Sequence, residues 1–170
     1  MGRELILAAF EKLDSELARR RLRADLFVVG GAAIALAYRR DRRTRDVDAV
    51  FEKPAEVYEA ARAVARRMHL PSDWLNDAVR SYMLGEDAAA RPTYEGKALQ
   101  VSVASPGYLL AMKLLAARVE QDASDIKLLY GLCGYSTPRE GAALLESYLP
   151  GRPLPEETGA LLEALFGASE

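Results

Sequence analysis

The feature that most constrains the fold of this chain is a glycine pair followed by two aspartates in a second apolar run. Gly30–Gly31 ends the apolar residues 25–29, and residues 46–51 read Asp-Val-Asp-Ala-Val-Phe. Side chains on a strand alternate between its two faces, so Asp46 and Asp48 would share one face. Two carboxylates on one face repel each other and resist burial, a cost that a divalent cation bound between them would remove.

This pattern predicts a metal and phosphate site. Mg²⁺, or the similar Mn²⁺, is typically held by one or two protein carboxylates together with substrate phosphate oxygens. Glycines let a backbone approach a phosphate at a helix N-terminus. Asp46 and Asp48 are the expected metal ligands, with Gly30 and Gly31 as phosphate-binding residues. Taken alone, the glycines also fit a tight strand-to-helix turn, and the aspartates an exposed edge strand.

The length of the chain favours a single compact unit, and its composition favours a protein that resides in a reducing compartment. The chain has 170 residues, 50% of them hydrophobic, which suits a single compact unit with a core over residues 1–104 and a helical C-terminal subdomain over 105–170. The lone Cys133 has no internal disulfide partner. No apolar stretch approaches the roughly 20 residues that span a bilayer, and no signal peptide is recognisable. We therefore expect a cytoplasmic protein without membrane contact.

Basic residues gather between the glycines and the aspartates. Residues 1–67 hold 15 Lys and Arg against 11 Asp and Glu, whereas residues 68–170 hold 8 against 14. The five arginines nearest the carboxylates are Arg39, Arg40, Arg42, Arg43 and Arg45. A polyanionic partner such as RNA would account for them, and so would a solvated loop whose arginines offset nearby acids. A second arginine cluster, at residues 19–23, has the same two interpretations.

Apolar spacing and helix caps predict the order of elements. Helices are expected over residues 3–22, 32–38, 54–67, 71–83, 105–118, 122–133, from 137 and over 155–166, and strands over 25–29, 46–51 and 98–103. Residues 85–97 are expected to be loop with a strand edge at Thr93–Tyr94. A small mixed sheet followed by a helical half predicts an α+β fold, or an α/β hybrid.

The glycine and aspartate motifs resemble those of the nucleotidyltransferase superfamily. Residues 27–36 (FVVGGAAIAL) and 42–51 (RRTRDVDAVF) match its signature of apolar strand, glycine pair, short helix and a strand carrying Asp-x-Asp. Residues 70–77 and the helix 108–118, with Asp122 and Asp125 beyond it, look like the branch that contains AbiEii-type toxins. The resemblance spans residues 25–130 and implies a small mixed β-sheet flanked by helices.

The resemblance also implies roles for individual residues. Asp46 and Asp48 would hold metal ions that bridge a nucleoside triphosphate and activate an acceptor hydroxyl. Active members add a third carboxylate from a later strand, but the expected strand 98–103 (ALQVSV) has no acid. Glu95 could serve if the strand begins earlier, and Asp122 or Asp125 could reach the site from the helical half.

Further residues have two interpretations each. Thr44 would orient a phosphate or cap the turn, with Arg42 beside it. Lys113 and Arg118 resemble cations aimed at nucleotide phosphates, although Arg118 also fits an ion pair with Asp122 or Asp125. Trp74 and Asn76 would line the base pocket by stacking and hydrogen bonding, although a tryptophan among apolar residues is commonly core.

Three functions follow. The first is a nucleotidyltransferase that transfers a nucleotidyl group to a hydroxyl of RNA, protein or a small molecule, plausibly a toxin restrained by a cognate protein partner. The second is an inactive nucleotide-binding or interaction module that has lost the third carboxylate. The third is a subunit whose helical half binds a protein through an exposed apolar stripe, which would comprise Leu144, Leu145, Leu161, Leu162 and Leu165.

Overall fold

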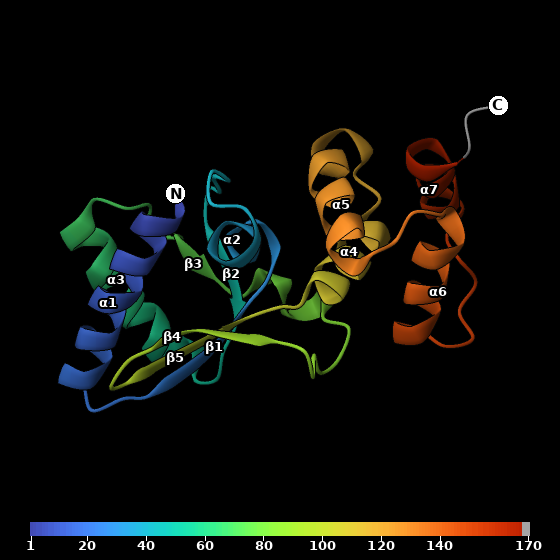
Figure 1. The fold of residues 1–170 in the computed structure, drawn as a ribbon. Coiled ribbons are helices and arrows are strands. Elements are labelled where there is room, and N and C mark those ends of the chain that lie inside the picture. Colours follow the sequence, from blue (N-terminus) through green and yellow to red (C-terminus); the bar gives the residue numbers. More distant parts are fainter. Residues whose placement is uncertain (168–170) are drawn as a thin grey trace. The chain divides into compact units, whose positions relative to one another are not determined.

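The computed structural model describes residues 1–167 and divides the chain into two units (Figure 1). The first unit comprises Met1–Ser81 and Ala89–Ala104, and the second comprises Tyr82–Ala88 and the chain from Ser105 onward. The first unit holds a mixed five-stranded sheet with helices, and the second is helical, so the expected α+β class is confirmed. Within residues 1–167, no helix is both long and apolar enough to cross a membrane.

The sheet has the strand order β3-β2-β1-β5-β4. Its strands are β1 (Ala24–Val28), β2 (Val47–Val50), β3 (Leu75–Asn76), β4 (Arg91–Glu95) and β5 (Leu99–Val103). The central strand β1 runs parallel to β5 and antiparallel to β2, while β3 is parallel to β2 and β4 antiparallel to β5. The expected strands at β1, β2 and β5 are confirmed to within a residue or two at their ends, and β4 is longer than the expected edge at Thr93–Tyr94.

The prediction of a helix over residues 71–83 is wrong. The chain there forms the short strand β3 and then a 3₁₀ helix, η2 (Ala78–Tyr82). Trp74 is fully buried, and its indole N–H donates to the carbonyl of Ala61 at 3.0 Å. Its own carbonyl accepts a hydrogen bond from the amide of Val47 at 2.6 Å. These contacts draw the chain alongside β2, so tertiary pairing overrides the local helix signal.

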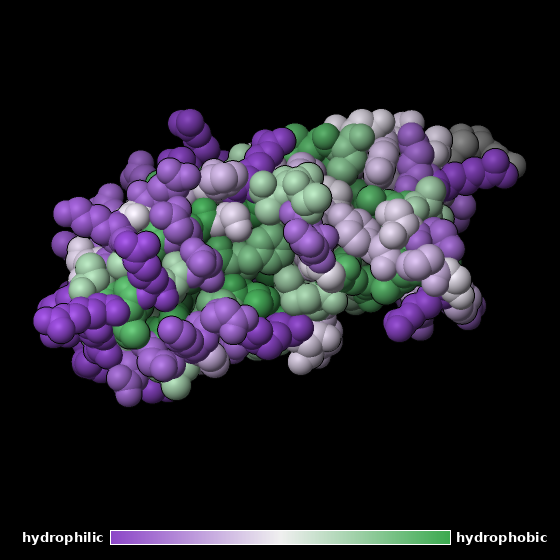
Figure 2. All heavy atoms as spheres, turned by 90° about the horizontal axis from the view of Figure 1, so that it is seen from below, coloured by the Kyte–Doolittle hydropathy of each residue, from purple (hydrophilic) through white to green (hydrophobic). Residues whose placement is uncertain are grey.

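Helices cover one face of the sheet and leave the other open. In the first unit these are α1 (Arg3–Arg19), α2 (Gly30–Ala33), which continues as the π-helix η1 (Ile34–Tyr38), and α3 (Pro54–Met68), with α1 and α3 side by side (Figure 1). Side chains on the covered face are buried, among them Leu26, Val28, Val47 and Ala49. Asp48 and Val50 alternate with these on β2 and face the open side. Figure 2 views the molecule from that side, where hydrophobic residues show between hydrophilic ones.

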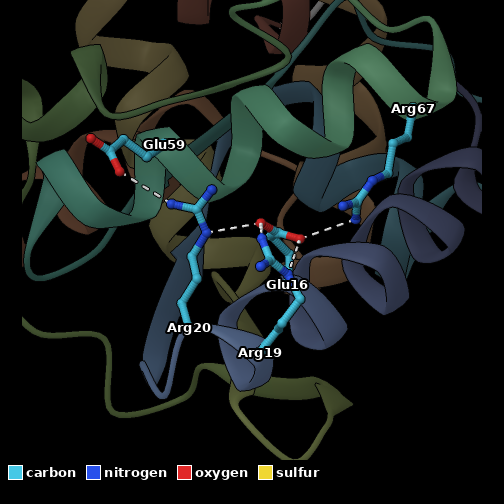
Figure 3. A network of polar contacts seen from close by, with 5 residues as sticks. All are labelled: Glu16, Arg19, Arg20, Glu59 and Arg67. Atoms are coloured by element: carbon cyan, nitrogen blue, oxygen red, sulfur yellow. Dashed lines mark hydrogen bonds and ion pairs between the residues drawn. The ribbon is translucent and has the colours of Figure 1, made fainter.

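A buried carboxylate ties α1 to α3 (Figure 3). Glu16 is 1% exposed and forms ion pairs with Arg19 at 2.6 Å, Arg20 at 2.8 Å and Arg67 at 3.0 Å. Arg20 also reaches Glu59 on α3 at 3.1 Å. Hydrogen bonds from these arginines, Arg19 first, outweigh burial and lower the pKa of Glu16 to about 2. Arg19 and Arg20, in the arginine cluster at residues 19–23, are therefore internal partners of an acid.

The second unit contains α4 (Pro106–Ala116), α5 (Val119–Cys133), α6 (Pro138–Tyr148) and α7 (Glu156–Phe166). Thr137 and Glu140 form a capping box at the start of α6, where the sequence predicts a helix from residue 137. Leu145, Leu161 and Leu162 are buried, and Leu144 and Leu165 are half-buried. These five leucines therefore form no exposed apolar stripe, which removes the observation that would have favoured a protein-binding helical half.

Candidate functional site

The two glycines bring the start of α2 against the aspartates and the loop before β2. Gly30 has a φ of +64°, a conformation that L side chains rarely adopt, and a Cβ there would lie 3.0 Å from Oδ2 of Asp48. A Cβ at Gly31 would lie 2.9 Å from Oγ1 of Thr44. The absence of side chains at both positions is thus what allows the close approach. The structure brings together the glycines, Thr44 and the aspartates, as the sequence predicts.

The helix that starts at Gly30 changes its hydrogen-bond pattern after one turn. Residues 34–38 form a π-helix, in which the amide of Arg39 donates to the carbonyl of Ile34 at 2.8 Å. Such π segments are common at functional sites. The first N–H groups of any helix lack partners within the helix, so this end offers donors beside the carboxylates.

The aspartate pair lies at the start of β2. Asp46 precedes the strand and Asp48 lies on it, and both side chains are half-buried. Burial, and after it the charge of Asp46, raise the pKa of Asp48, while a hydrogen bond from Asn76 acts in the opposite direction. Two half-buried carboxylates side by side, with bare glycine backbone alongside, are a donor set that suits a hard divalent cation. The residues present therefore fit Mg²⁺ or Mn²⁺.

Asn76 contacts the pair in a way that sequence reasoning missed. Its Nδ2 donates to Oδ2 of Asp46 at 3.3 Å, and the residue stands opposite Asp48 in the pairing of β2 with β3. The sequence suggested Asn76 only as a base-pocket residue, because a two-residue strand has no periodicity to reveal it. Trp74, the proposed stacking residue, is fully buried in the core and so is not placed to stack on a base.

The arginine-rich loop is fixed at its end by Thr44. The Thr44 hydroxyl donates to the carbonyl of Asp46 at 3.1 Å and so closes the turn into β2. Arg42 donates to the carbonyl of Arg43 at 2.7 Å, and one of its guanidinium nitrogens lies 3.9 Å from the position of a Gly31 Cβ. Arg42 therefore lies beside the glycine turn, where the sequence predicts an anion-binding side chain.

Lys113, Asp122 and Asp125 belong to the second unit and contact one another. The Lys113 amino group pairs with Asp122 and, at 3.2 Å, with Asp125, which is 3% exposed. The sequence favoured Arg118 for these ion pairs, because it lies four residues from Asp122, but the structure gives this role to Lys113 on the preceding helix. Lys113 lies in α4 and the two acids in α5, so the ion pairs connect neighbouring helices.

A third carboxylate is not found beside Asp46 and Asp48 in the part of the chain that the structure describes. Strand β5 carries no acid, and Glu95 lies on β4, where it is exposed and pairs with Gln100. Within residues 1–167, no three or more His, Cys, Asp or Glu side chains group in a way that could hold a metal ion.

Two hollows flank this region in the first unit. A cavity of about 360 Å³ lies along the open face beyond Val50, and its polar lining includes Asp25, Glu52 and Glu95. A second, of about 690 Å³, is lined by residues 1–5 and 40–43, which include four arginines and two acids. The first hollow is thus acidic and the second basic.

Comparison with protein families gives a match over most of the chain. A family model described as "Nucleotidyltransferase of unknown function (DUF6036)" matches residues 5–130, which include the glycine turn, the aspartate pair and β1 to β5. No curated protein and no solved structure matches the chain significantly.

Proposed function

The chain belongs to DUF6036, a family of nucleotidyltransferases of unknown function, and on that premise we propose that it transfers a nucleotidyl group from a nucleoside triphosphate to a hydroxyl acceptor. The acceptor oxygen would attack the α-phosphorus as the bond from that phosphorus to the bridging oxygen breaks, pyrophosphate would leave, and the hydroxyl proton would pass to solvent water. The carboxylate pair beside the glycine turn is the observation that supports this proposal.

Asp46 and Asp48 would hold Mg²⁺ or Mn²⁺. Such an ion neutralises charge on the triphosphate and the attacking oxygen, which is most of what phosphoryl-type transfer requires. Gly30 and Gly31 would present backbone N–H groups to the phosphates, and Arg42 would add a positive charge. Thr44 would keep the turn into β2 closed, so that the two carboxylates stay aimed at the triphosphate. Lys113 and Arg118 stay proposed phosphate partners from the second unit.

The two hollows suggest where acceptors of different charge would bind. An RNA acceptor suits the arginine-lined hollow at residues 40–43, because phosphates favour basic surfaces. The acidic hollow beyond Val50 suits a neutral or cationic hydroxyl compound. We favour RNA because Arg42 lies both in the basic hollow and beside the glycine turn. An AbiEii-like toxin activity would follow from transfer to a cellular RNA.

A nucleotide-binding module without transfer is the second candidate. It is favoured by the amide of Asn76, which stands beside Asp46 on the neighbouring strand where a further carboxylate would complete the ligand set. Such a protein would bind the metal–triphosphate complex and release it unchanged.

The test is label transfer from α-³²P nucleoside triphosphates with Mg²⁺ and bulk RNA. We expect labelled RNA with the unaltered protein and none with the Asp46→Ala/Asp48→Ala variant. The matched control is Glu11→Ala, which removes an exposed carboxylate of α1 that lines neither hollow.

The outcomes separate the candidates. Label on protein or on an added small hydroxyl compound, again lost in the double variant, would keep the transferase and exclude RNA as acceptor. Triphosphate binding that needs both aspartates, without transfer to any acceptor, would overturn the enzyme and favour the binding module. Equal transfer by the double variant would contradict the metal site.

A further inference from the structure

Asn76 lies opposite one aspartate of the pair and donates a hydrogen bond to the other. Strands β2 and β3 pair in parallel with Asp48 opposite Asn76, so their side chains share the open face. The Asn76 amide then reaches across to Oδ2 of Asp46 at 3.3 Å. One neutral group therefore lies against both carboxylates, since it donates to Asp46 and stands opposite Asp48 in the strand pairing.

The orientation of this amide is fixed by a second hydrogen bond. The backbone N–H of Ala78 donates to Oδ1 of Asn76 at 3.2 Å. Because a donor at that position requires an acceptor, the oxygen faces Ala78 and the NH₂ group faces the carboxylates. The side chain thus offers hydrogen-bond donors, and no negative charge, to the pair.

The backbone around Asn76 is held firmly on both sides. Trp74 is anchored in the core through Ala61 at 3.0 Å. Asp77 accepts hydrogen bonds from Tyr58 and from Arg80, the latter at 3.2 Å, and its amide donates to the Tyr58 hydroxyl at 2.9 Å. Hydrogen bonding from Tyr58, and then Arg80, lowers the pKa of Asp77, so the carboxylate next to Asn76 is committed to this scaffold.

We propose that Asn76 is the positioning residue of the aspartate pair: its NH₂ group holds Asp46 and Asp48 together without metal, and its neutrality limits the site to two negative charges. This inference rests on the proposed function. Two carboxylates without further protein ligands bind a free divalent cation weakly and bind it well when triphosphate oxygens complete the coordination. The metal therefore enters with its nucleotide.

The charge of residue 76 is open to a direct test with three variants. Asn76→Asp adds a carboxylate of the same size, and Asn76→Ala removes the amide. Ser15→Asp is the matched control, because it adds one negative charge at an exposed position of α1 in the same unit. Two quantities are measured: the Kd for Mn²⁺ without nucleotide, by calorimetry or paramagnetic resonance, and the thermal unfolding midpoint in EDTA.

We expect Asn76→Asp to bind Mn²⁺ about tenfold more tightly or better, since affinity rises with the number of charged ligands. Both Asn76 variants should melt earlier than wild type in EDTA, and Mn²⁺ should restore the midpoint of Asn76→Asp alone. Ser15→Asp should change neither quantity. If Asn76→Asp matches Ser15→Asp in both, the inference is overturned whatever the transfer assay gives. If the expected shifts occur and wild type transfers no label, the proposed function fails and the role of Asn76 stands.

Discussion

Glu16 and the Asp46–Asp48 pair belong to the same unit, but their negative charges are compensated to opposite degrees. Glu16 is buried and receives three arginines, so its pKa falls to about 2 and it is a finished structural contact (Figure 3). Asp48 is half-buried beside another carboxylate, and the contact that relieves the pair is an amide. Burial, and then Asp46, raise the pKa of Asp48.

This difference separates carboxylates that stabilise the fold from carboxylates available for chemistry. An acid whose charge is compensated internally contributes to folding and has little to offer a ligand. A pair whose repulsion is left in place costs stability, and such costs are characteristic of functional sites. Asp122 and Asp125, which share Lys113, resemble Glu16 in this respect.

The largest effect on the free energy of unfolding is expected from Lys113→Met. This substitution tests whether Lys113 compensates buried acids in the second unit, as arginines compensate Glu16 in the first. The substitution keeps most of the side-chain length and removes the cation from Asp125, which is 3% exposed. Loss of a partner from a buried ion pair should lower the free energy of unfolding by about 3 kcal/mol. Urea unfolding at pH 7 measures this, with exposed Lys127→Met on α5 as control.

The same variant tests the nucleotide role predicted for Lys113. If that residue only holds α4 to α5, triphosphate affinity measured well below the unfolding midpoint should stay within twofold of wild type. A tenfold loss of triphosphate affinity would instead indicate that Lys113 is a phosphate ligand. Its ion pairs with Asp122 and Asp125 would then not be purely structural, unlike those of Glu16.

Glu16→Gln should destabilise the first unit by about 2 kcal/mol at pH 7. The drop in pKa from 4.5 to about 2 sets an upper limit near 3 kcal/mol. Arg19 and Arg67 have 64% and 57% exposed side chains, and solvent screening reduces that limit. Exposed Glu11→Gln on the same helix is the control.

The pH dependence of the Glu16 effect has a definite sign. A carboxylate with a lowered folded-state pKa contributes fully above its unfolded value, here 4.5, and loses its contribution as the pH falls to about 2. The gap between wild type and Glu16→Gln should therefore close over that interval. A gap that is constant with pH would mean that packing, and not charge, explains the destabilisation.

Gly30→Ala should cost about 1–2 kcal/mol, because an L residue is strained at positive φ. Its Cβ would also lie 3.0 Å from Oδ2 of Asp48, so triphosphate affinity should fall together with stability. Gly131→Ala is the control: its Cβ would meet no heavy atom within 4 Å, and alanine favours the helix interior. Unchanged triphosphate binding by Gly30→Ala would remove the glycine turn from the site.

The motif carried by local sequence was predictable, and what depends on tertiary contacts was not. Gly30, Gly31, Asp46 and Asp48 lie close in the chain, and strand alternation is enough to place the two aspartates on one face. Sheet and helix boundaries followed from apolar spacing for most elements.

Trp74, Asn76 and Glu16 show where sequence reasoning fails. The Trp74 indole finds the carbonyl of Ala61 on α3, a contact that turns an expected helix into β3 and carries Asn76 to the pair. Glu16 reads as one more acid on an amphipathic helix, because its partner Arg67 is 51 residues away. Its neighbours Arg19 and Arg20, at helical spacing, were the one local signal.

The smallest effect on the free energy of unfolding is expected from Asp48→Asn in metal-free protein. This variant also gives the most direct test of the difference between Glu16 and the aspartate pair. Removing one charge of a repelling pair while keeping its shape should raise the free energy of unfolding by about 1 kcal/mol, the reverse of Glu16→Gln. Mn²⁺ and triphosphate binding should be lost in the same variant. Urea unfolding in EDTA measures the gain, with Asp41→Asn on the exposed loop as control. A loss of stability like that of Glu16→Gln would show that Asp48 is a structural acid. Removal of a charged group stabilises the folded protein only when that charge is uncompensated.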